Sequence, residues 1–279
     1  MKITVAKDAG YCFGVRDAVN MAYDSAKEFG DVYMLGDIVH NEQVVDDLEN
    51  VGTKVVESLD DVPKDSPILF RAHGTVNGLW EKAKEKKMRV IDATCPLVHE
   101  IHHEVKKLAA DGRQIIIIGD HGHDEVIAIA DQVAGSIIIS SPEEAQILRK
   151  MKRVGVVSQS TQMIENVKGI INILMEKAFD LHFVNTICYP TKRNHEQIKT
   201  LAVENDMMII IGSFTSANSK RLTELSKERN ENSFQVTCAN DLKIDWFKNK
   251  NSVGISAGAS TPDYLIEEVK NKIQEYTRV

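Results

Sequence analysis

The chain has 279 residues, of which 43% are hydrophobic and 27% charged, a composition that excludes disordered and fibrous proteins and suffices for two or three small lobes. The 34 Lys and Arg residues against 41 Asp and Glu residues give a net charge of −7, which argues against nucleic acid or an anionic membrane as a partner. The start has no apolar core of the signal-peptide type, and no apolar run is long enough to span a bilayer, so we expect a cytoplasmic protein.

Short runs of β-branched residues alternate with amphipathic segments along the whole chain. The runs predict strands at 32–35, 68–70, 90–91, 115–118, 137–139, 154–157, 208–211 and 253–255. The amphipathic segments predict helices at 16–29, 78–87, 97–110, 163–178, 193–204, 220–229 and 262–276. Strands that alternate with such helices form parallel sheets, so the predicted fold class is α/β with mainly parallel sheets.

Three of the four cysteines divide the chain into nearly equal thirds, each with about three predicted strands: Cys12, Cys95 and Cys188. Because thirds of that size are marginally stable alone, we expect three small lobes that meet at a centre where these cysteines converge. The predicted lobes are 13–95, 96–187 and 188–270, with terminal segments 1–12 and 271–279 packed on them. Cysteines spread through a long chain favour reduced thiols over a disulfide framework.

The same cysteines are candidate metal ligands, since each lies where a strand gives way to a turn. A Pro close behind Cys95 and Cys188 also occurs in iron–sulfur ligation. The alternative for each is a small buried apolar side chain. Cys238 follows a similar segment, so spacing alone leaves it open as a fourth ligand.

Polar residues follow the predicted strands, most of them Gly, Ser, Thr, Asn or His and almost none Lys or Arg. They lie at 36–41, 71–75, 119–125, 158–161, 212–218 and 256–262. Ligands of parallel sheets bind beyond the carboxyl ends of the strands, and backbone N–H groups at helix N-termini hold anions. N-capping and turn formation would account for any single segment. Six together predict a site for a phosphate or diphosphate ligand.

Eight of the nine histidines fall into two groups. His40, His73 and His123 follow strands and are candidate ligand-binding residues. Five others lie in or beside predicted helices and are interpreted as surface or packing residues: His99, His102, His103, His182 and His195.

Two other motifs point to hydrolases. Residues 254–258 match the Gly-x-Ser-x-Gly pattern around Ser256, but a serine hydrolase of that type needs a later histidine and none follows. His121, His123 and Glu125 could bind zinc, although the sequence identifies no further ligands. No glycine-rich dinucleotide or P-loop motif occurs.

Taken together, these segments resemble the family of 4-hydroxy-3-methylbut-2-enyl diphosphate reductases over essentially the whole chain. The matching segments are AGYCFGV at 9–15, VHN at 39–41, RAHG at 71–74, DATCP at 92–96, GHDEV at 122–126, TIC at 186–188, SANS at 216–219 with RL at 221–222, and AGASTPD at 257–263.

The resemblance implies a trefoil of three α/β lobes around a [4Fe–4S] cluster held by Cys12, Cys95 and Cys188, which leaves one iron open for the hydroxyl of the substrate. Cys238 is then structural. The resemblance also implies substrate-binding residues for the diphosphate: His40, His73, His123, Ser160, Ser216, Ala217, Asn218 and Ser260.

The implied reaction is the last step of the methylerythritol phosphate pathway to isoprenoids. Two electrons enter through the cluster, the C–O bond breaks with loss of water, and protonation gives isopentenyl or dimethylallyl diphosphate. Glu125 is the expected proton donor. Its place at a helix start favours the carboxylate, whereas an anionic diphosphate and a reduced cluster favour the acid, so its protonation state stays open. Ferredoxin or flavodoxin is the implied electron donor.

The chain departs from the common family pattern at three positions. Ser160 stands where Thr is usual, Asp124 where Pro is frequent, and Ala217 where a second Ser is common. Two other classes remain as alternatives: an iron–sulfur sensor that uses the same three cysteines without catalysis, and a zinc-dependent hydrolase built on His121, His123 and Glu125.

Overall fold

The computed structural model describes residues 1–277 and divides into two compact units. One unit comprises Met1–Arg16, Val39–Asp47 and Tyr189–Val279, and the other comprises Asp17–Ile38 and Leu48–Cys188. Residues 278 and 279, the end of the predicted terminal segment 271–279, lie outside the described residues. We call the unit that contains Met1–Arg16 the terminal unit and the unit that contains Leu48–Cys188 the central unit.

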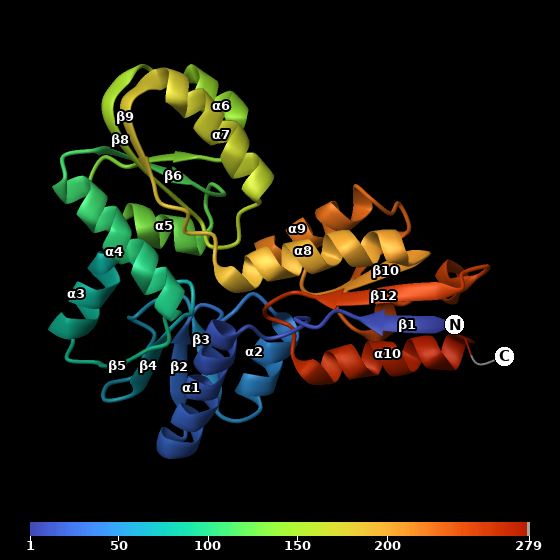
Figure 1. The fold of residues 1–279 in the computed structure, drawn as a ribbon. Helices are drawn as coiled ribbons and strands as arrows, with labels where there is room; N and C mark the ends of the chain where they lie inside the picture. The colour runs from blue at the N-terminus through green and yellow to red at the C-terminus, as the bar shows by residue number, and fades with distance from the viewer. Residues whose placement is uncertain (278–279) are drawn as a thin grey trace. The chain divides into compact units, whose positions relative to one another are not determined.

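The strands of residues 1–277 form three four-stranded sheets, and every strand pair in them is parallel, which confirms the predicted α/β class (Figure 1). The first sheet has the order β3-β2-β4-β5 and consists of β2 (Val32–Leu35), β3 (Thr53–Val56), β4 (Pro67–Phe70) and β5 (Arg89–Asp92). The second has the order β7-β6-β8-β9 and consists of β6 (Gln114–Ile118), β7 (Ile137–Ile139), β8 (Met151–Ser158) and β9 (Ala178–Phe183). The third has the order β1-β12-β10-β11 and consists of β1 (Lys2–Val5), β10 (Met207–Ile211), β11 (Ser233–Val236) and β12 (Ser252–Ala257).

All three sheets share one strand order. Within each of the first two sheets, the strands can be numbered one to four in chain order. Their order across the sheet is then two, one, three, four. The third sheet repeats this order as β11, β10, β12 and β1, so the N-terminal strand takes the place of a fourth strand. β1 pairs with β12 in the register Lys2↔Ser252 to Val5↔Ile255.

Seven of the ten α-helices within residues 1–277 follow the amphipathic segments that the sequence predicts. The ten are α1 (Phe13–Phe29), α2 (Glu42–Glu49), α3 (Asn77–Glu85), α4 (Pro96–Ala110), α5 (Asp124–Ala130), α6 (Pro142–Ile147), α7 (Ile164–Lys177), α8 (Tyr189–Glu204), α9 (Ala217–Lys227) and α10 (Asp263–Thr277), with short 3-10 helices η1 (Ala239–Asp241) and η2 (Ile244–Phe247).

The prediction of about three strands in each third was too low for the first two thirds, which hold four each. It is correct for residues 188–277, which hold three, because β1 supplies the fourth strand of the third sheet. The four strands that the predicted ranges missed, β1, β3, β9 and β11, all lie at sheet edges. Edge strands here are only partly buried and lack the unbroken apolar runs of inner strands such as β10. His182 lies in β9 rather than in or beside a helix.

The second sheet shows how alternating side chains supply two cores. Ile116 and Ile118 of β6 pack with α6 and α7 on one face. Ile115 and Ile117 of the same strand pack with α4 and α5 on the other. Successive strand residues point to opposite faces, so a run of four isoleucines fixes helices on both sides and holds the starts of α4 and α5 beside the sheet.

The third sheet packs one face against α10. Ile209, Ile255 and the helix residues Leu265 and Val269 belong to one buried cluster, and Figure 1 shows α10 beside β1 and β12. Ser256 points into the protein from within β12, opposite Ile210, and is 2% exposed. It therefore does not occupy the exposed turn that a nucleophilic serine of the Gly-x-Ser-x-Gly type requires.

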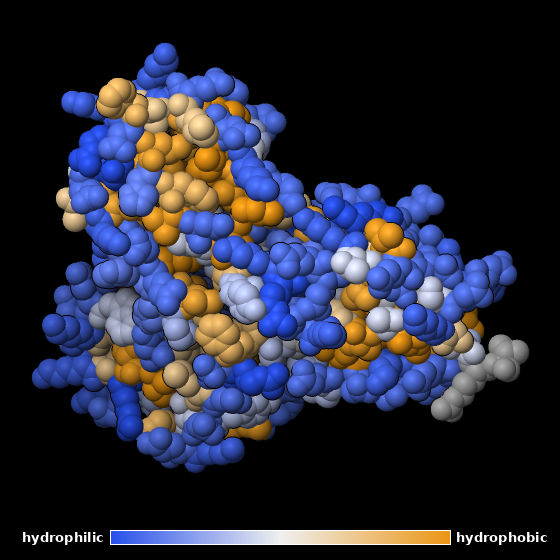
Figure 2. All heavy atoms as spheres, in the orientation of Figure 1, coloured by the Kyte–Doolittle hydropathy of each residue, from blue (hydrophilic) through white to orange (hydrophobic). Residues whose placement is uncertain are grey.

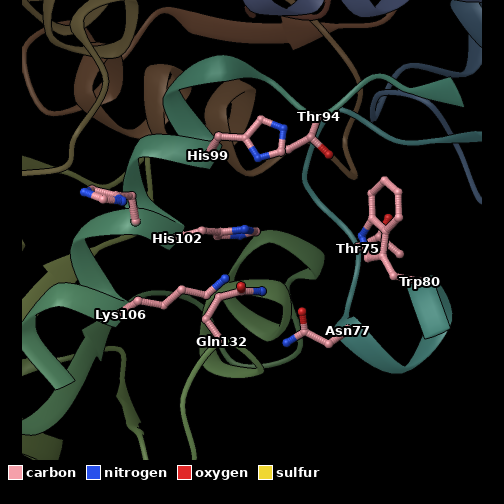
Figure 3. A pocket seen from close by; sticks show the side chains of 9 residues that line it. Thr75, Asn77, Trp80, Thr94, His99, His102, Lys106 and Gln132 are labelled. Carbon is pink, nitrogen blue, oxygen red and sulfur yellow. The ribbon is translucent and has the colours of Figure 1, made fainter. Parts of the chain in front are cut away.

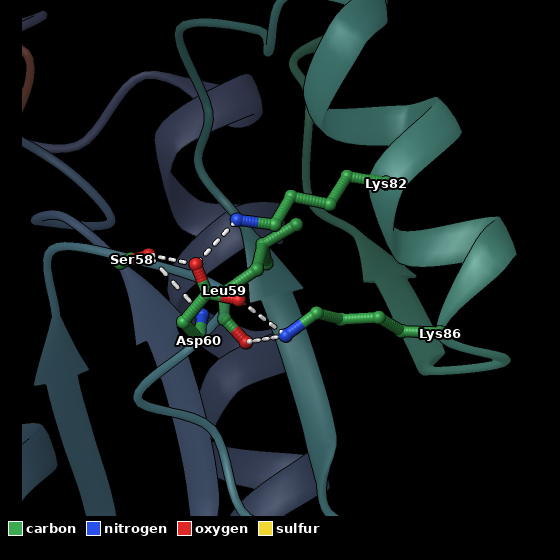
Figure 4. A network of polar contacts seen from close by, with 5 residues as sticks. All are labelled: Ser58, Leu59, Asp60, Lys82 and Lys86. Carbon is green, nitrogen blue, oxygen red and sulfur yellow. Dashed lines mark hydrogen bonds and ion pairs between the residues drawn. The ribbon is translucent and has the colours of Figure 1, made fainter.

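A network of polar contacts ties α3 to the segment between β3 and β4 (Figure 4). Lys82 of α3 and Lys86, the residue that follows the end of α3, donate to the two carboxylate oxygens of Asp60 at 2.6 Å and 2.5 Å. Lys86 also donates to the backbone oxygen of Leu59, whose side chain is fully buried. The hydrogen bonds that Asp60 accepts from Lys82 and Lys86 lower its pKa to about 2 from its ordinary value of 3.8.

Exposed apolar side chains gather on the second sheet and its helices. Ile147, Met175 and Phe179 are 85%, 64% and 90% exposed, and Figure 2 shows apolar surface over this part of the molecule. Within residues 1–277, no helix combines the length and the apolar character needed to cross a membrane.

Candidate functional site

Three cysteines occupy equivalent places in the three sheets. Cys95 follows β5, Cys188 follows β9 and Cys12 follows β1, the fourth strand of each sheet in the shared order. In each case the residue after the cysteine is the first residue of a helix. These helices are α4 after Cys95, α8 after Cys188 and α1 after Cys12. The thirds marked by these cysteines in the sequence therefore correspond to a structural repeat.

One hydrogen bond recurs at each of these cysteines. Its backbone N–H donates to the carbonyl two residues beyond the third strand of its own sheet. The pairs are Cys12 to Ala259 at 3.2 Å, Cys95 to Ala72 at 3.0 Å and Cys188 to Ser160 at 2.9 Å. All three residues are half-buried. A thiol at a helix N-terminus is stabilised as the thiolate, which is the form that ligates iron.

Cys238 differs from this pattern. It follows β11, the second strand of its sheet in the shared order, and caps the 3-10 helix η1. Position within the repeat therefore separates Cys238 from the other three, a distinction that sequence spacing did not make.

Glu125 is bound by Ser160 within the central unit. Its side chain is 2% exposed, and both carboxylate oxygens accept hydrogen bonds from Ser160, one from the backbone N–H at 2.6 Å and one from the hydroxyl at 2.7 Å. Glu125 lies in the first turn of α5, and Ser160 lies just beyond β8, so the carboxylate is fixed where the second sheet ends.

Two of the predicted histidines lie together in the same unit. His73 and His123 make a perpendicular ring contact with centroids 5.7 Å apart. His123 is also the N-cap of α5, and its Nδ1 accepts a hydrogen bond from the backbone N–H of Glu125 at 3.2 Å. His73 follows β4, so the ends of the first and second sheets contribute neighbouring rings.

Arg71 is a residue of this region that the sequence did not single out. Its Nη1 lies 2.6 Å from Oδ2 of Asp124, and the two side chains are 26% and 25% exposed. The departure from proline at 124 thus supplies a partner for Arg71. This pair spans 53 residues of sequence, and only the fold reveals it.

The remaining predicted ligand-binding residues lie in the terminal unit. Ser216 caps α9 and accepts from the backbone N–H of Ser219, with Ala217 as the first helical residue. Ser260 follows β12 and donates its hydroxyl hydrogen to the carbonyl of His40 at 3.1 Å. Side chains of Ser216, Asn218 and Ser260 are nearly buried.

Asn218 carries the clearest sign of a missing partner. Its side chain is 5% exposed, and neither its Oδ1 nor its Nδ2 finds a hydrogen-bond partner among residues 1–277. A buried amide without partners costs about 1–3 kcal/mol for each unpaired group, so a polar ligand that bonds it would recover this loss.

Close packing brings α9 onto the ends of β10 and β12. A Cβ at either Gly212 or Gly258 would lie 2.2 Å from Oγ of Ser219. Only glycine fits at these two positions, and its absence of a side chain allows the first turn of α9 to approach both strand ends.

The zinc-hydrolase alternative gains no support from His121. Its Nε2 lies 2.8 Å from Oε2 of Glu144, on the exposed surface of the central unit. This hydrogen bond holds the pKa of Glu144 below its ordinary value. Glu125 meanwhile is bound by Ser160, so the side chains of the suggested triad have other partners.

Three parallel sheets, with polar loops and an equivalent cysteine at their strand ends, define an α/β protein, a class in which ligands commonly bind at the carboxyl ends of the strands. The chain belongs to the LytB protein family, whose model matches residues 3–274.

Similar proteins span the full length of the chain. A protein of Geobacter sulfurreducens is 40% identical over 277 residues, with 99% of this chain and 98% of that protein covered. One of Aquifex aeolicus is 39% identical over 278 residues, with 98% and 96% covered. Both are named 4-hydroxy-3-methylbut-2-enyl diphosphate reductase.

Two solved structures also match. One, described as (E)-4-hydroxy-3-methyl-but-2-enyl diphosphate reductase, the terminal enzyme of the non-mevalonate pathway, is 38% identical with a TM-score of 0.74, and 99% of this chain and 100% of that chain are covered. The other, E-1-hydroxy-2-methyl-but-2-enyl-4-diphosphate reductase from Plasmodium falciparum, is 30% identical with a TM-score of 0.92, and 98% and 87% are covered.

Proposed function

We propose that this chain reduces 4-hydroxy-3-methylbut-2-enyl diphosphate to isopentenyl diphosphate and dimethylallyl diphosphate, the terminal step of the non-mevalonate pathway. The observation that carries the proposal is family membership over residues 3–274, with a relative of that name 40% identical over 99% of the chain. The fold adds independent support, because chemistry-bearing residues follow the strands of all three sheets.

Family membership implies an iron–sulfur cofactor. We propose that it is a [4Fe–4S] cluster held by Cys12, Cys95 and Cys188, with one iron left open. The support is the shared position of these cysteines, each at the start of a helix and each hydrogen-bonded to the same carbonyl of its repeat. When bound, such a cluster supplies electrons and a Lewis-acidic iron that weakens a C–O bond.

Glu125 is the proposed proton donor. Loss of hydroxide is slow near neutral pH, so a positioned acid that converts the leaving group to water lowers the barrier. Ser160 fixes the Glu125 carboxyl group from two sides and leaves it little rotational freedom. An anionic substrate beside this buried group would favour its protonated form.

The diphosphate is the proposed ligand of the histidines and of the small polar residues at the strand ends. They are His40, His73, His123, Ser160, Ser216, Ala217, Asn218 and Ser260. The unpaired amide of Asn218 supports this assignment, because its Nδ2 can donate to a phosphate oxygen. Ala217 offers only a backbone N–H, at the helix N-terminus where anions are favoured.

The electron donor and the lobe limits belong to the same proposal. Ferredoxin or flavodoxin would supply single electrons to the cluster, and the lobes would run 13–95, 96–187 and 188–270. Each sheet lies within one such lobe except for β1, which completes the third sheet from the N-terminal segment.

The test is anaerobic purification, quantification of iron and acid-labile sulfide, and an assay of substrate reduction with a strong artificial reductant. We expect about four irons for each chain, as a [4Fe–4S] cluster requires, together with both products. A cluster without turnover would favour the sensor alternative, and zinc without iron would favour the hydrolase.

Replacing Glu125 with Gln tests the proton donor. Glu125→Gln keeps a side chain that can still accept from Ser160 but loses the carboxylic acid, so we expect retained iron content and substrate affinity with turnover reduced at least about 100-fold. Unchanged turnover would remove Glu125 from the proposed role.

A further inference from the structure

The three equivalent cysteines differ in how the chain just before them is fixed. In the first sheet, Asp92 lies three residues before Cys95, and its Oδ1 accepts a hydrogen bond from the backbone N–H of Thr94 at 3.0 Å. Oδ2 of the same carboxylate lies 3.2 Å from Nε2 of His99, on the helix that follows the cysteine. Thr94 and His99 line one pocket of about 370 Å³, and Figure 3 shows both side chains. The approach to Cys95 is therefore fixed by local contacts.

The second sheet repeats this device, and the third does not. Asn185 lies three residues before Cys188, and its Oδ1 accepts from the backbone N–H of Ile187 at 3.3 Å. A side-chain acceptor that bonds the N–H two residues further on fixes a turn without long-range partners. The corresponding position before Cys12 is Ala9, whose methyl group cannot accept a hydrogen bond. Cys12 therefore needs another restraint.

Asp8, the residue before Ala9, binds α8 within the terminal unit. Its Oδ1 lies 2.7 Å from Nη2 of Arg193, and its Oδ2 accepts a hydrogen bond from Nε2 of Gln197. Oε1 of Gln197 in turn accepts from the backbone N–H of Asp8 at 3.1 Å. Arg193 and Gln197 are four residues apart and so lie on one face of α8. Both the backbone and the side chain of Asp8 are thus attached to this helix.

The restraint acts close to the thiol. Cys12 lies four positions after Asp8, a stretch that spans at most about 14 Å even when fully extended. The backbone bond from Cys12 to Ala259, at 3.2 Å, is the longest of the three equivalent bonds, the others being 3.0 Å and 2.9 Å. Hydrogen bonds weaken as they lengthen, so the contact of Asp8 with α8 matters most where the repeated bond is longest.

We propose that Asp8 is a positioning residue for Cys12, which it fixes for cluster binding through Arg193 and Gln197. The inference rests on the proposed ligation of the cluster by the three equivalent cysteines. Loss of the contact with α8 lets the segment before Cys12 open more often, and iron held by its thiolate then exchanges faster with a chelator. Asp8 is expected to affect cluster retention more than folding.

The test is the rate of iron release from the anaerobically purified, cluster-loaded protein into excess chelator, followed by the visible absorption of the cluster. We expect Asp8→Ala to start with about four irons and to release them at least about fivefold faster than the parent. Asp8→Glu keeps the carboxylate, and the flexible side chain of Arg193 can follow it, so its rate should stay within about twofold of the parent. Tm of each variant is measured in parallel.

Gln197→Ala tests the path of the effect. If Asp8 acts through this contact, adding Gln197→Ala to Asp8→Ala should not speed release further, because the same contact is lost only once. Asp245→Asn is the matched control, since it removes an exposed carboxylate of the terminal unit that pairs with Lys248. It should release iron at the rate of the parent. Gln197→Ala also keeps the test available if Asp8→Ala fails to fold.

Cys12→Ala separates this inference from the proposed function. Loss of the cluster in Cys12→Ala, with a parent rate of release in Asp8→Ala, would overturn the role of Asp8 and leave the ligand assignment standing. A parent-like cluster in Cys12→Ala would overturn that assignment and the inference with it. A lower Tm of Asp8→Ala with unchanged release, or equally fast release in Asp8→Glu and Asp8→Ala, would also overturn the positioning role.

Discussion

Ser160 controls the geometry of Glu125, since its backbone N–H and its hydroxyl bond the two carboxylate oxygens. We predict that Ser160→Ala, which removes only the hydroxyl bond, lowers kcat about 10- to 100-fold, the effect of losing one hydrogen bond to a charged group. Ser160→Thr keeps the hydroxyl and should retain most of the rate. The measurement is kcat and KM for each variant, with iron content as the check on the cluster.

A change confined to KM in Ser160→Ala would assign Ser160 to substrate binding alone. Equal kcat in the Ala and Thr variants would show that the hydroxyl does not matter to the proton donor. Either result would leave the backbone bond as the only support of Glu125 from this residue.

The ion pair of Arg71 and Asp124 is partly buried, so its loss should be measurable. We predict that Asp124→Asn lowers the free energy of unfolding by about 1–2 kcal/mol, between the values for exposed and buried pairs. Urea denaturation gives this number. Asp111→Asn is the matched control, because Asp111 is 58% exposed and lies 3.8 Å from Arg113, so it should change stability by less than about 0.5 kcal/mol.

Candidate residues could be found in the sequence wherever a loop follows an apolar strand, as with Glu125 and His123. Their partners could not. The carboxylate of Asp124 finds Arg71 far along the chain, and the buried Nε2 of His102 depends on helix packing that no local pattern records. Long-range contacts and desolvation were therefore the missing information, rather than residue type.

At the scale of single elements, burial decided which strands could be predicted. Inner strands such as β4 and β10 are buried at every position and read as continuous apolar runs. β9 is an edge strand with partly exposed residues and follows α7 without a loop, so its sequence merges with the helical pattern. The short helices α2 and α6 were missed because six to eight residues hold too few turns to establish a period.

Asp60 makes α3 sensitive to acid. Its folded pKa of about 2 lies below the ordinary 3.8, so its contribution to stability is complete above about pH 4 and disappears as the pH falls through about 2. We predict that Asp60→Asn lowers Tm slightly at pH 7, and that the difference from the parent narrows at pH 3 and in 1 M salt. Thermal unfolding under these three conditions measures it.

The companion control is Asp245→Asn, which removes an exposed partner of Lys248 on η2. It should leave Tm unchanged at every pH. A Tm difference for Asp60→Asn that stays constant from pH 7 to pH 3 would mean that the carboxylate charge is not what holds Lys82 and Lys86.

For the whole molecule, the cysteine spacing predicted repeating thirds, and the three sheets have one strand order. The sequence did not reveal that the third sheet is completed from the opposite end of the chain. Four residues of β1 pair with β12, and no local pattern in the sequence indicates a partner so far along the chain. A parallel pairing between residues about 250 positions apart is fixed by packing against the α10 cluster.

This arrangement predicts a tolerated circular permutation. α10 leads from β12 toward β1 as the crossover of a parallel pair, so the two chain ends belong to the same sheet. A variant that begins at Asp31, ends at Gly30 and joins the original ends by a flexible linker should place three complete repeats in sequence. We expect cooperative unfolding with Tm within about 10 °C of the parent and equal iron content.

The control carries the same linker at the C-terminus without the permutation. If the control unfolds cooperatively and the permuted chain does not, then continuity between α1 and β2 is required for folding, and the repeat does not act as an independent unit of the chain.

The pairing of β1 with β12 also affects when the third sheet can be completed during synthesis of the chain. β1 and Cys12 leave the ribosome first, whereas β12, their partner in the third sheet, is among the last segments made. The N–H of Cys12 can meet its acceptor, the carbonyl of Ala259, only after β12 has been synthesised. Cys12 therefore reaches its place at the end of the third sheet later than Cys95 and Cys188 reach theirs, because the carbonyls of Ala72 and Ser160 that accept from those two cysteines precede them in the chain.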